Sequence, residues 1–371
     1  MEDSRIKILM TTDTLGGVWT YTLELCKILG VYGVEVHLAS LGALPSPGQE
    51  KEVSSLENVS LYRSDFKLEW MQDCAEDLIE MRKWIYSLYR EIQPTLVHFN
   101  NFVPLNFNGT PIITVFHSCV QTWWESVKSK SAPAEWENYK QHVKNSLNVS
   151  NLVISPSCAL LRQAMEIYEF SSKTKVIHNG RELKFSEEIN KEKIIFAMGR
   201  IWDEAKNLEI LSAVAKNLAW PVYIAGDNKD PHTGKELQIE NVHFVGQLSS
   251  SEVKEYLQRA SIFVSPAKYE PFGLSILEAA KAGCALAISN IDTLQELWCG
   301  AATFFDPGNK NEIQNKLLQL IDDENKREEL AAKAEKRAAS YDLQKMGECY
   351  MELYKELIYT NQPIRKPSYS L

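Results

Sequence analysis

The chain is short of positive charge. Its 371 residues contain 40 Lys and Arg against 49 Asp and Glu, a net charge of -9. Since affinity for a nucleic-acid backbone comes from clustered Lys and Arg, this balance argues against a nucleic-acid-binding protein. No stretch approaches the roughly 18 apolar residues of a membrane helix, and residues 1–5 lack the layout of a signal peptide. We therefore expect a cytoplasmic protein, and peripheral attachment to the inner face of a membrane stays open.

The patterns of a disulfide framework, a metal centre and a dinucleotide site are also missing. The seven cysteines are scattered without CxxC or metal-ligand spacing, so we expect reduced thiols. No GxGxxG follows the first apolar run, which weakens the hypothesis of a nicotinamide-dependent dehydrogenase. Nothing in the sequence indicates an oligomeric state.

Apolar runs that alternate with helix-like segments predict an α/β fold with parallel sheets. In the first half, strands are predicted at 6–12, 34–40, 95–99, 112–116, 152–155 and 175–177. In the second half, strands are predicted at 194–198, 222–225, 242–245, 262–265, 285–289 and 303–305. Helices are predicted there near 207–218, 250–259, 274–282 and 312–321, and the segment 328–357 should form one or two long helices.

The length exceeds what one hydrophobic core usually organises, so two domains are expected. We place a doubly wound N-terminal domain at 1–185 and a second at 190–340, separated by a charged stretch around 185–193. A helix within 341–358 should return to brace the first domain. Ligands of open parallel sheets bind beyond the carboxyl ends of the strands, so two such domains facing each other would form a cleft.

The segment from Glu270 to Glu278 carries the strongest functional signal. Pro271 disfavours a helical conformation in the residue before it, which places Glu270 on a loop and predicts a helix that opens at 271–273. The free N–H groups of a helix start, with the positive end of its dipole, favour a phosphate. The candidate donors are the N–H groups of Phe272, Gly273 and Leu274. The spacing alone would fit equally well if Glu270 were an ordinary loop charge and Glu278 lay on the solvent-exposed face of a helix.

Two cations follow the predicted strand 194–198. Arg200 and Lys206 are close enough in the chain to hold a diphosphate from two sides, although solvated surface charges would look the same. Gly16 and Gly17 follow the first predicted strand and would let the backbone approach a ligand closely, as would also be found in an ordinary turn.

Two further candidates lie at strand ends. His117 ends the strand predicted at 112–116, where a single histidine is more often structural than catalytic. Gln247 lies in the turn after the strand predicted at 242–245 and carries no chemistry by itself.

Together these motifs resemble the signature of glycosyltransferase family four, which has the GT-B fold of two Rossmann-like, doubly wound parallel-sheet domains around a central cleft. The resemblance implies that Glu270 contacts the donor sugar near its reacting carbon and that Glu278 binds the nucleotide ribose. It implies that Arg200 and Lys206 bind the diphosphate, that Gly16 and Gly17 lie against the phosphates, and that His117 contacts the sugar. In that family the turn at Gln247 lies beside the base.

The resemblance also implies an activity. We expect a retaining glycosyltransferase of the hexosyltransferase type that moves a sugar from a nucleotide-diphosphate sugar to a hydroxyl acceptor, such as a glycan, a lipid-linked sugar or a small molecule. Polysaccharide biosynthesis is the expected setting. No metal or other cofactor is expected, and no Asp-x-Asp triplet follows a predicted strand. The chain departs from the family pattern at His178, Arg181 and Ile291-Asp292, which bear on the choice of sugar and base.

Two other functions fit the same residues. One is a catalytically silent nucleotide-sugar-binding subunit of a polysaccharide-assembly complex, although every candidate catalytic side chain is present. The other is a different GT-B enzyme, such as a sugar-nucleotide epimerase or a phosphorylase.

Overall fold

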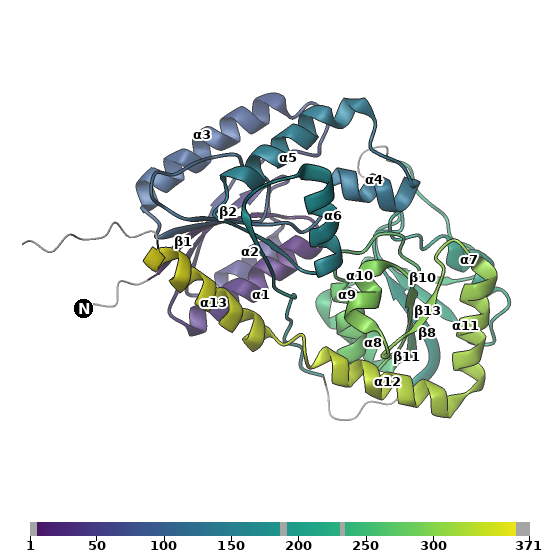
Figure 1. Cartoon of the computed structure of the whole chain (residues 1–371). Helices are drawn as coiled ribbons and strands as arrows, with labels where there is room; N and C mark the ends of the chain where they lie inside the picture. The colour runs from purple at the N-terminus through teal and green to yellow at the C-terminus, as the bar shows by residue number, and fades with distance from the viewer. Residues whose placement is uncertain (1–5, 186–190, 231–233, 361–371) are drawn as a thin grey trace, which may run out of the picture.

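The computed structural model describes residues 6–185, 191–230 and 234–360. Within them, two parallel sheets form two domains joined side by side (Figure 1). The segment 1–5 lies outside the described residues, as does most of the charged stretch predicted around 185–193. Of the helices described, none combines the length and the apolarity that crossing a membrane requires.

The first domain holds a seven-stranded sheet in the order β3-β2-β1-β4-β5-β6-β7. Its strands are β1 (Lys7–Asp13), β2 (Glu35–Leu41), β3 (Val59–Arg63), β4 (Leu96–Phe99), β5 (Ile112–Val115), β6 (Leu152–Ser155) and β7 (Lys173–Val176). Its helices are α1 (Gly17–Val31), α2 (Pro47–Ser54), α3 (Ala75–Ile92), α4 (Val120–Lys128), α5 (Glu137–Val149) and α6 (Cys158–Tyr168). The order of strands reverses at β1, so the ends of β1 and β4 form the switch point where such sheets bind ligands.

The second domain holds a six-stranded sheet in the order β10-β9-β8-β11-β12-β13. Its strands are β8 (Glu192–Met198), β9 (Val222–Ala225), β10 (His243–Gly246), β11 (Ala260–Ser265), β12 (Ala285–Ser289) and β13 (Thr303–Phe305). Its helices are α7 (Ile210–Ala215), α8 (Ser250–Arg259), α9 (Leu274–Lys281), α10 (Asp292–Trp298), α11 (Lys310–Asp322) and α12 (Glu324–Ala338). Its switch point lies between β8 and β11.

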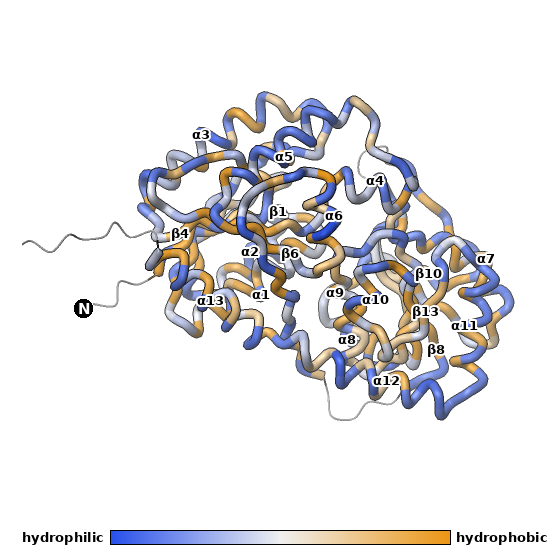
Figure 2. The backbone as a smooth tube through the Cα atoms, in the orientation of Figure 1, coloured by the Kyte–Doolittle hydropathy of each residue, from blue (hydrophilic) through white to orange (hydrophobic). Residues whose placement is uncertain are grey.

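Apolar residues concentrate in the sheets and on the inner faces of the helices (Figure 2). The central strands β1, β4, β11 and β12 are almost entirely buried, as is the middle of β8, because helices cover both faces of a parallel sheet. Strands buried on both faces consist of continuous apolar residues, which is why these strands could be predicted from the sequence. The edge strand β3 was not predicted, since its residues are exposed or only half buried and show no buried run.

The chain crosses between the domains twice, and the two crossings touch. Arg181 N donates to Tyr341 O at 3.4 Å. A Cβ atom on Gly180 would lie 2.4 Å from Asp342 O, so only glycine allows this approach. After the second crossing, α13 (Leu343–Thr360) packs on α1 within the core of the first domain. The last helix of the chain thus belongs structurally to the first domain.

Candidate active site

The candidate residues lie on the loops that follow the carboxyl ends of strands in both sheets and on the helices that those loops enter. A Cβ atom on Gly16, in the loop after β1, would lie 3.3 Å from a guanidinium nitrogen of Arg200, which follows β8. A Cβ atom on Gly17 would lie 3.7 Å from the side chain of Leu274, the first residue of α9. The first domain therefore brings its glycine loop against the cation and the helix start of the second.

Glu270 and Lys206 are in direct contact. Lys206 Nζ donates to Glu270 Oε2 at 2.6 Å, and the exposed fractions of the two side chains are 24% and 11%. The backbone carbonyl of Glu270 accepts from Thr293 Oγ1 at 2.7 Å. The predicted loop position of Glu270 is thus what the structure has, and its carboxylate lies at the cation that the sequence assigned to the diphosphate.

The helix predicted at 274–282 is confirmed as α9, but residues 271–273, which were expected to open it, are not helical. It starts at Leu274, because Gly273 adopts a left-handed conformation with φ of 86° that no helical residue has. The predicted helix opening at 271–273 is wrong in this respect, and Leu274 is the first helical N–H group of the predicted three. The Phe272 side chain is buried between His178 and Tyr341, so it serves packing while its backbone stays in the loop.

Arg200 is the more exposed cation of the pair. Its Nη2 atom donates to Asp203 Oδ2 at 2.7 Å, and its guanidinium lies over the ring of Trp202. The helix predicted to begin at Asn207 begins only at Ile210, since Asn207 has a positive φ of 52°. The Asn207 amide instead donates to the carbonyls of Pro266 and Pro307, which fixes the loop that presents Lys206.

His117 is a neutral ring in this site. Its Nε2 atom lies 2.9 Å from the amide oxygen of Asn100, whose amide nitrogen donates to Thr11 O. Because an amide oxygen only accepts, Nε2 carries the hydrogen and Nδ1 is left as an acceptor. Burial, with a smaller effect of His98, lowers the pKa of His117 to about 3. The ring is therefore suited to accept a hydroxyl hydrogen rather than to donate a proton.

Glu278 has a partner that its position in the sequence does not reveal. Arg181, in the crossing between the domains, places Nε 2.9 Å from Glu278 Oε1, an ion contact without hydrogen-bond geometry. Burial raises the pKa of Glu278, and the charge of Arg181 opposes that shift. Glu24 on α1 also faces this cation, since Arg181 lowers its pKa against a larger rise from burial. Arg181, which departs from the family pattern, thus supplies a positive charge beside the second glutamate of the motif.

Gln247 comes from the edge of the second sheet. It is exposed on the loop after β10, the edge strand of the second sheet. The loops after β8, β9 and β10 are nevertheless joined, because Gly199 N donates to Ala225 O and Gly226 N donates to Gly246 O. The structure therefore places Gln247 at one end of a continuous row of strand-end loops.

Two carboxylates at the first switch point were missed by the sequence analysis. Asp13 ends β1, accepts from Leu15 N at 2.8 Å, and has its pKa raised by burial to about 6. Glu69 lies in the loop after β3, and burial raises its pKa to about 7 although Phe102 N–H opposes the shift. Asp13 lies close to Gly16 and Gly17 in the sequence, and its position at the end of the first predicted strand could have identified it. Glu69 lies in a loop with no local pattern to single it out.

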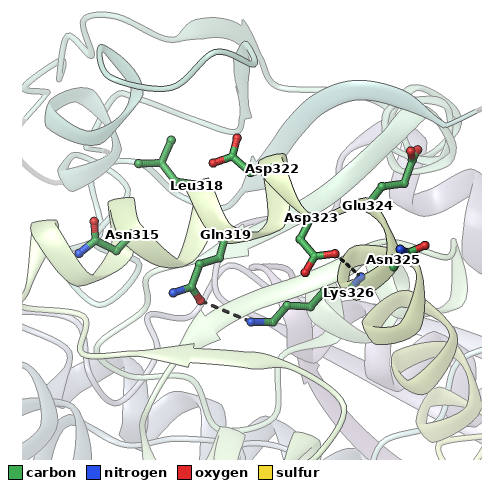
Figure 3. Close-up of a pocket in the computed structure, with 8 residues that line it drawn as sticks. All are labelled: Asn315, Leu318, Gln319, Asp322, Asp323, Glu324, Asn325 and Lys326. Carbon is green, nitrogen blue, oxygen red and sulfur yellow. Dashed lines mark hydrogen bonds between the residues drawn. The ribbon is translucent and has the colours of Figure 1, made fainter.

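A polar hollow on the outer side of the second domain contains none of these residues. It has a volume of about 870 Å³ and lies where α11 joins α12 (Figure 3). Its lining is Asn315, Leu318, Gln319, Asp322, Asp323, Glu324, Asn325 and Lys326. Its position on the helices, away from the strand ends, separates it from the candidate site (Figure 1). Among the described residues, no group of three or more His, Cys, Asp or Glu is placed to hold a metal ion.

Two family models match consecutive parts of the chain. The model described as Glycosyltransferase Family 4 matches residues 15–185, and the model described as Glycosyl transferases group 1 matches residues 179–337. Together they extend from the glycine loop of the first domain to the end of α12 in the second.

Curated relatives match over part or most of their length. The N,N'-diacetylbacillosaminyl-diphospho-undecaprenol alpha-1,3-N-acetylgalactosaminyltransferase of Campylobacter jejuni is 29% identical over 177 residues, 46% of each chain. The glycogen synthase of Mycobacterium tuberculosis is 47% identical over 62 residues, 17% of this chain and 15% of the enzyme. The D-rhamnosyltransferase WbpZ of Pseudomonas aeruginosa is 22% identical over 305 residues, 76% of each chain. The matches to the first two thus span less than half of those enzymes.

Solved structures share the fold at low identity. Sucrose-phosphate synthase from Thermosynechococcus elongatus superposes with a TM-score of 0.77 at 18% identity, covering 96% of this chain and 100% of that one. HepE from Anabaena, in complex with UDP-glucose, superposes with a TM-score of 0.73 at 16% identity, covering 95% and 100%. The two-domain architecture predicted from the sequence is confirmed.

The buried carboxyl of Glu69 predicts a pH-dependent stability. A carboxyl whose pKa rises from 4.5 to about 7 on folding contributes stability in its protonated form below pH 4.5, and this is lost as the pH rises through about 7. Glu69→Gln has no charge to bury at any pH. As the pH rises across that range, the wild type should therefore lose up to about 3 kcal/mol of unfolding free energy that the variant keeps. Denaturant unfolding at several pH values measures this difference.

The exposed carboxylate of Glu135 supplies the control for that series. Glu135→Gln should follow the wild type at every pH. A Glu69→Gln curve parallel to the wild type would show that Glu69 is ionised in the folded protein near neutral pH.

Proposed function

As the chain belongs to glycosyltransferase family four, of the group 1 type and with the GT-B fold, we propose that it transfers a sugar from a nucleotide-diphosphate sugar to a hydroxyl acceptor. The observation that carries this proposal is the meeting of Glu270, Lys206 and Arg200 with the glycine loop of the opposite domain. The cations and the start of α9 form an anion site, and a carboxylate lies within it.

The positive groups suit a diphosphate leaving group. In the free protein, Lys206 pairs with Glu270 and Arg200 pairs with Asp203, so each cation already faces an anion. The negative oxygens of a bound diphosphate would pair with both cations and accept hydrogen bonds from the free N–H groups at the start of α9. These groups would then stabilise the charge that develops on the diphosphate as the glycosidic bond breaks.

Glu270 would act on the sugar rather than on the nucleotide. Once Lys206 turns to the phosphates, the Glu270 carboxylate is free to stabilise the positive charge of an oxocarbenium-like transition state. His117 Nδ1 would accept a hydrogen bond from a sugar hydroxyl and so orient the ring. We propose that the acceptor attacks on the face that the diphosphate leaves, which retains the anomeric configuration, and that its proton passes to the leaving phosphate.

A polysaccharide or lipid-linked glycan is the class of acceptor that the relatives suggest. The Campylobacter enzyme acts on a diphospho-undecaprenol-linked sugar, and WbpZ is a rhamnosyltransferase. We propose an acceptor of this class for this chain, presented from the first domain. Action at the inner face of a membrane would fit an acceptor linked to a lipid.

A panel of nucleotide sugars tests the proposed function directly. A nucleotide sugar at about 100 times its dissociation constant should stabilise the protein by roughly 2.7 kcal/mol, which raises the melting temperature. We expect one of the UDP-, GDP- and ADP-sugars to do so, and Lys206→Ala to abolish the shift. Product analysis with the donor then follows transfer. Conversion of the donor without an acceptor would indicate an epimerase, and an absence of any shift would contradict the proposal.

Transfer should not depend on a divalent ion. The cations Arg200 and Lys206, with the start of α9, take the place that a metal holds in metal-dependent transferases. Initial rates in excess EDTA should therefore equal those in buffer, and added Mg²⁺ or Mn²⁺ should leave kcat within about twofold. Loss of activity on chelation that added Mg²⁺ restores would overturn the metal-free mechanism.

The two glutamates of the motif should have separable roles. Glu270→Gln should lower kcat by about 10²- to 10³-fold and change donor affinity little, because its charge acts on the transition state. Glu278→Gln should mainly weaken donor binding, by about tenfold. Steady-state kinetics and donor titration measure both.

Melting temperatures provide the control, since Glu278→Gln leaves Arg181 without its carboxylate partner. The reverse pattern of kinetic effects would show that the roles are assigned wrongly. Intact cellular glycan output with Glu270→Gln, together with loss of donor binding by Lys206→Ala, would favour a catalytically silent subunit.

A further inference from the structure

The loop that carries Glu270 is held by the opposite domain on both sides of that residue. On the N-terminal side, the hydroxyl of Tyr269 lies 2.7 Å from Thr122 Oγ1 on α4. The Thr122 hydroxyl itself donates to Cys119 O, so the Tyr269 hydroxyl is the donor of this contact. On the C-terminal side, Ser157 Oγ donates to Pro271 O at 3.1 Å. The residues before and after Glu270 are therefore both anchored in the first domain.

The contact at Ser157 is part of a larger junction. Ser157 is the N-cap of α6, and its hydroxyl oxygen accepts from Leu160 N while its hydrogen points to the loop. Glu296, on α10 of the second domain, accepts from Cys158 N at 2.8 Å and from Ala159 N at 2.7 Å. The start of α6 is thus capped by a carboxylate from the other domain, which satisfies free N–H groups and meets the positive end of the helix dipole.

The contacts of Tyr269 and Ser157 are shielded from water, whereas the junction at Cys158 and Glu296 lies nearer the surface. Thr122 and Ser157 are fully buried, and Tyr269 is 8% exposed. A hydrogen bond lost in such a place leaves a buried polar group unpaired, which costs more than breaking the same bond at the surface. The contacts therefore bias the molecule towards the arrangement in which the two domains meet.

The ion pair between Lys206 and Glu270 behaves differently, since both residues belong to the second domain. Thr293, which holds the Glu270 carbonyl, belongs to it as well. Separation of the domains would leave these two contacts intact and would break those of Tyr269, Pro271 and Glu296. What the first domain adds is the orientation of the loop.

We propose that Tyr269, Ser157 and Glu296 are positioning residues that orient Glu270 only when the two domains meet. The inference rests on the proposed transferase function and deepens it. An open molecule would bind the donor through the cations of the second domain, with Lys206 turned from Glu270 to the phosphates and the Glu270 loop not yet held by the first domain. Closure against the first domain would then complete the site. A donor bound to the open molecule would therefore react little with water.

The first test is kinetic. Tyr269→Phe removes one hydroxyl, keeps the ring and leaves Glu270 in place. We expect kcat to fall about tenfold, as for one buried hydrogen bond, while the donor dissociation constant changes less than twofold. Thr122→Val should give the same loss, Thr122→Ser should restore the rate, and the double variant Tyr269→Phe/Thr122→Val should be no slower than either single change.

A matched control exists in the same hydrophobic cluster. The Tyr168 hydroxyl donates to Gln121 Oε1 at 3.2 Å and also contacts the Cys119 side chain, and neither partner belongs to the loop that carries Glu270. Tyr168→Phe also removes one buried tyrosine hydroxyl, and it should leave kcat within twofold of the wild type. Equal effects of Tyr168→Phe and Tyr269→Phe would reduce the Tyr269 contact to ordinary packing and would overturn the proposal.

The second test needs no activity, so it holds even if the proposed function fails. Hydrogen exchange of the backbone amides of Cys158 and Ala159 reports on the junction with Glu296. Glu296→Ala should speed their exchange directly. Tyr269→Phe, on the other side of the loop, should also speed it by about tenfold if the contacts form and break together, whereas Tyr168→Phe should not. Unchanged exchange in Tyr269→Phe would show that the contacts are independent, which contradicts the proposal.

Discussion

The arrangement of the site depends on the close contact between the two chain crossings. Gly180 lies against the carbonyl of Asp342 at a distance that excludes any Cβ atom. This contact fixes where the chain leaves the first domain and where it returns. Because it returns there, α13 packs on α1, and the carboxyl ends of the two sheets face each other. The candidate residues reach the site from the loops at those ends or from the helices that follow them, so their meeting follows from the crossing.

Charge in the site is balanced by pairs that a ligand would rearrange. Lys206 faces Glu270, Arg200 faces Asp203 and Arg181 faces Glu278. A half-buried cation without a partner would be costly, so these pairs maintain the site while it is free. Lys206 and Arg200 are exposed enough for a diphosphate to replace or join their carboxylate partners. Arg181 at the crossing is only 15% exposed, which makes its pair with Glu278 part of the fold as well as part of the site.

Local signals in the sequence predicted the strands well and the starts of helices less well. Buried central strands are continuous apolar runs, so their positions followed from composition alone. The range 274–282 predicted α9 correctly, but residues 271–273 do not open it because Gly273 takes a left-handed conformation. The start of α7 was wrong because Asn207 also has a positive φ. Neither conformation is visible in a pattern of apolar residues. The edge strand β3 was missed because it is paired on one side and half exposed.

The residues that act through long-range contacts could not be predicted by any local argument. Glu296 lies 138 residues from Cys158, and Tyr269 lies 147 residues from Thr122. His117 also depends on residues that are distant in the sequence, since its ring packs edge-on against Tyr21. The Tyr21 hydroxyl donates to the hydroxyl of Tyr350 on α13 at 2.5 Å.

The last helix therefore supports the ring that orients His117, although it lies at the other end of the chain. A site assembled from short motifs is thus held in position by side chains that those motifs do not contain. The sequence motif identifies the candidate groups, whereas the returning helix and the contacts between domains determine where those groups lie.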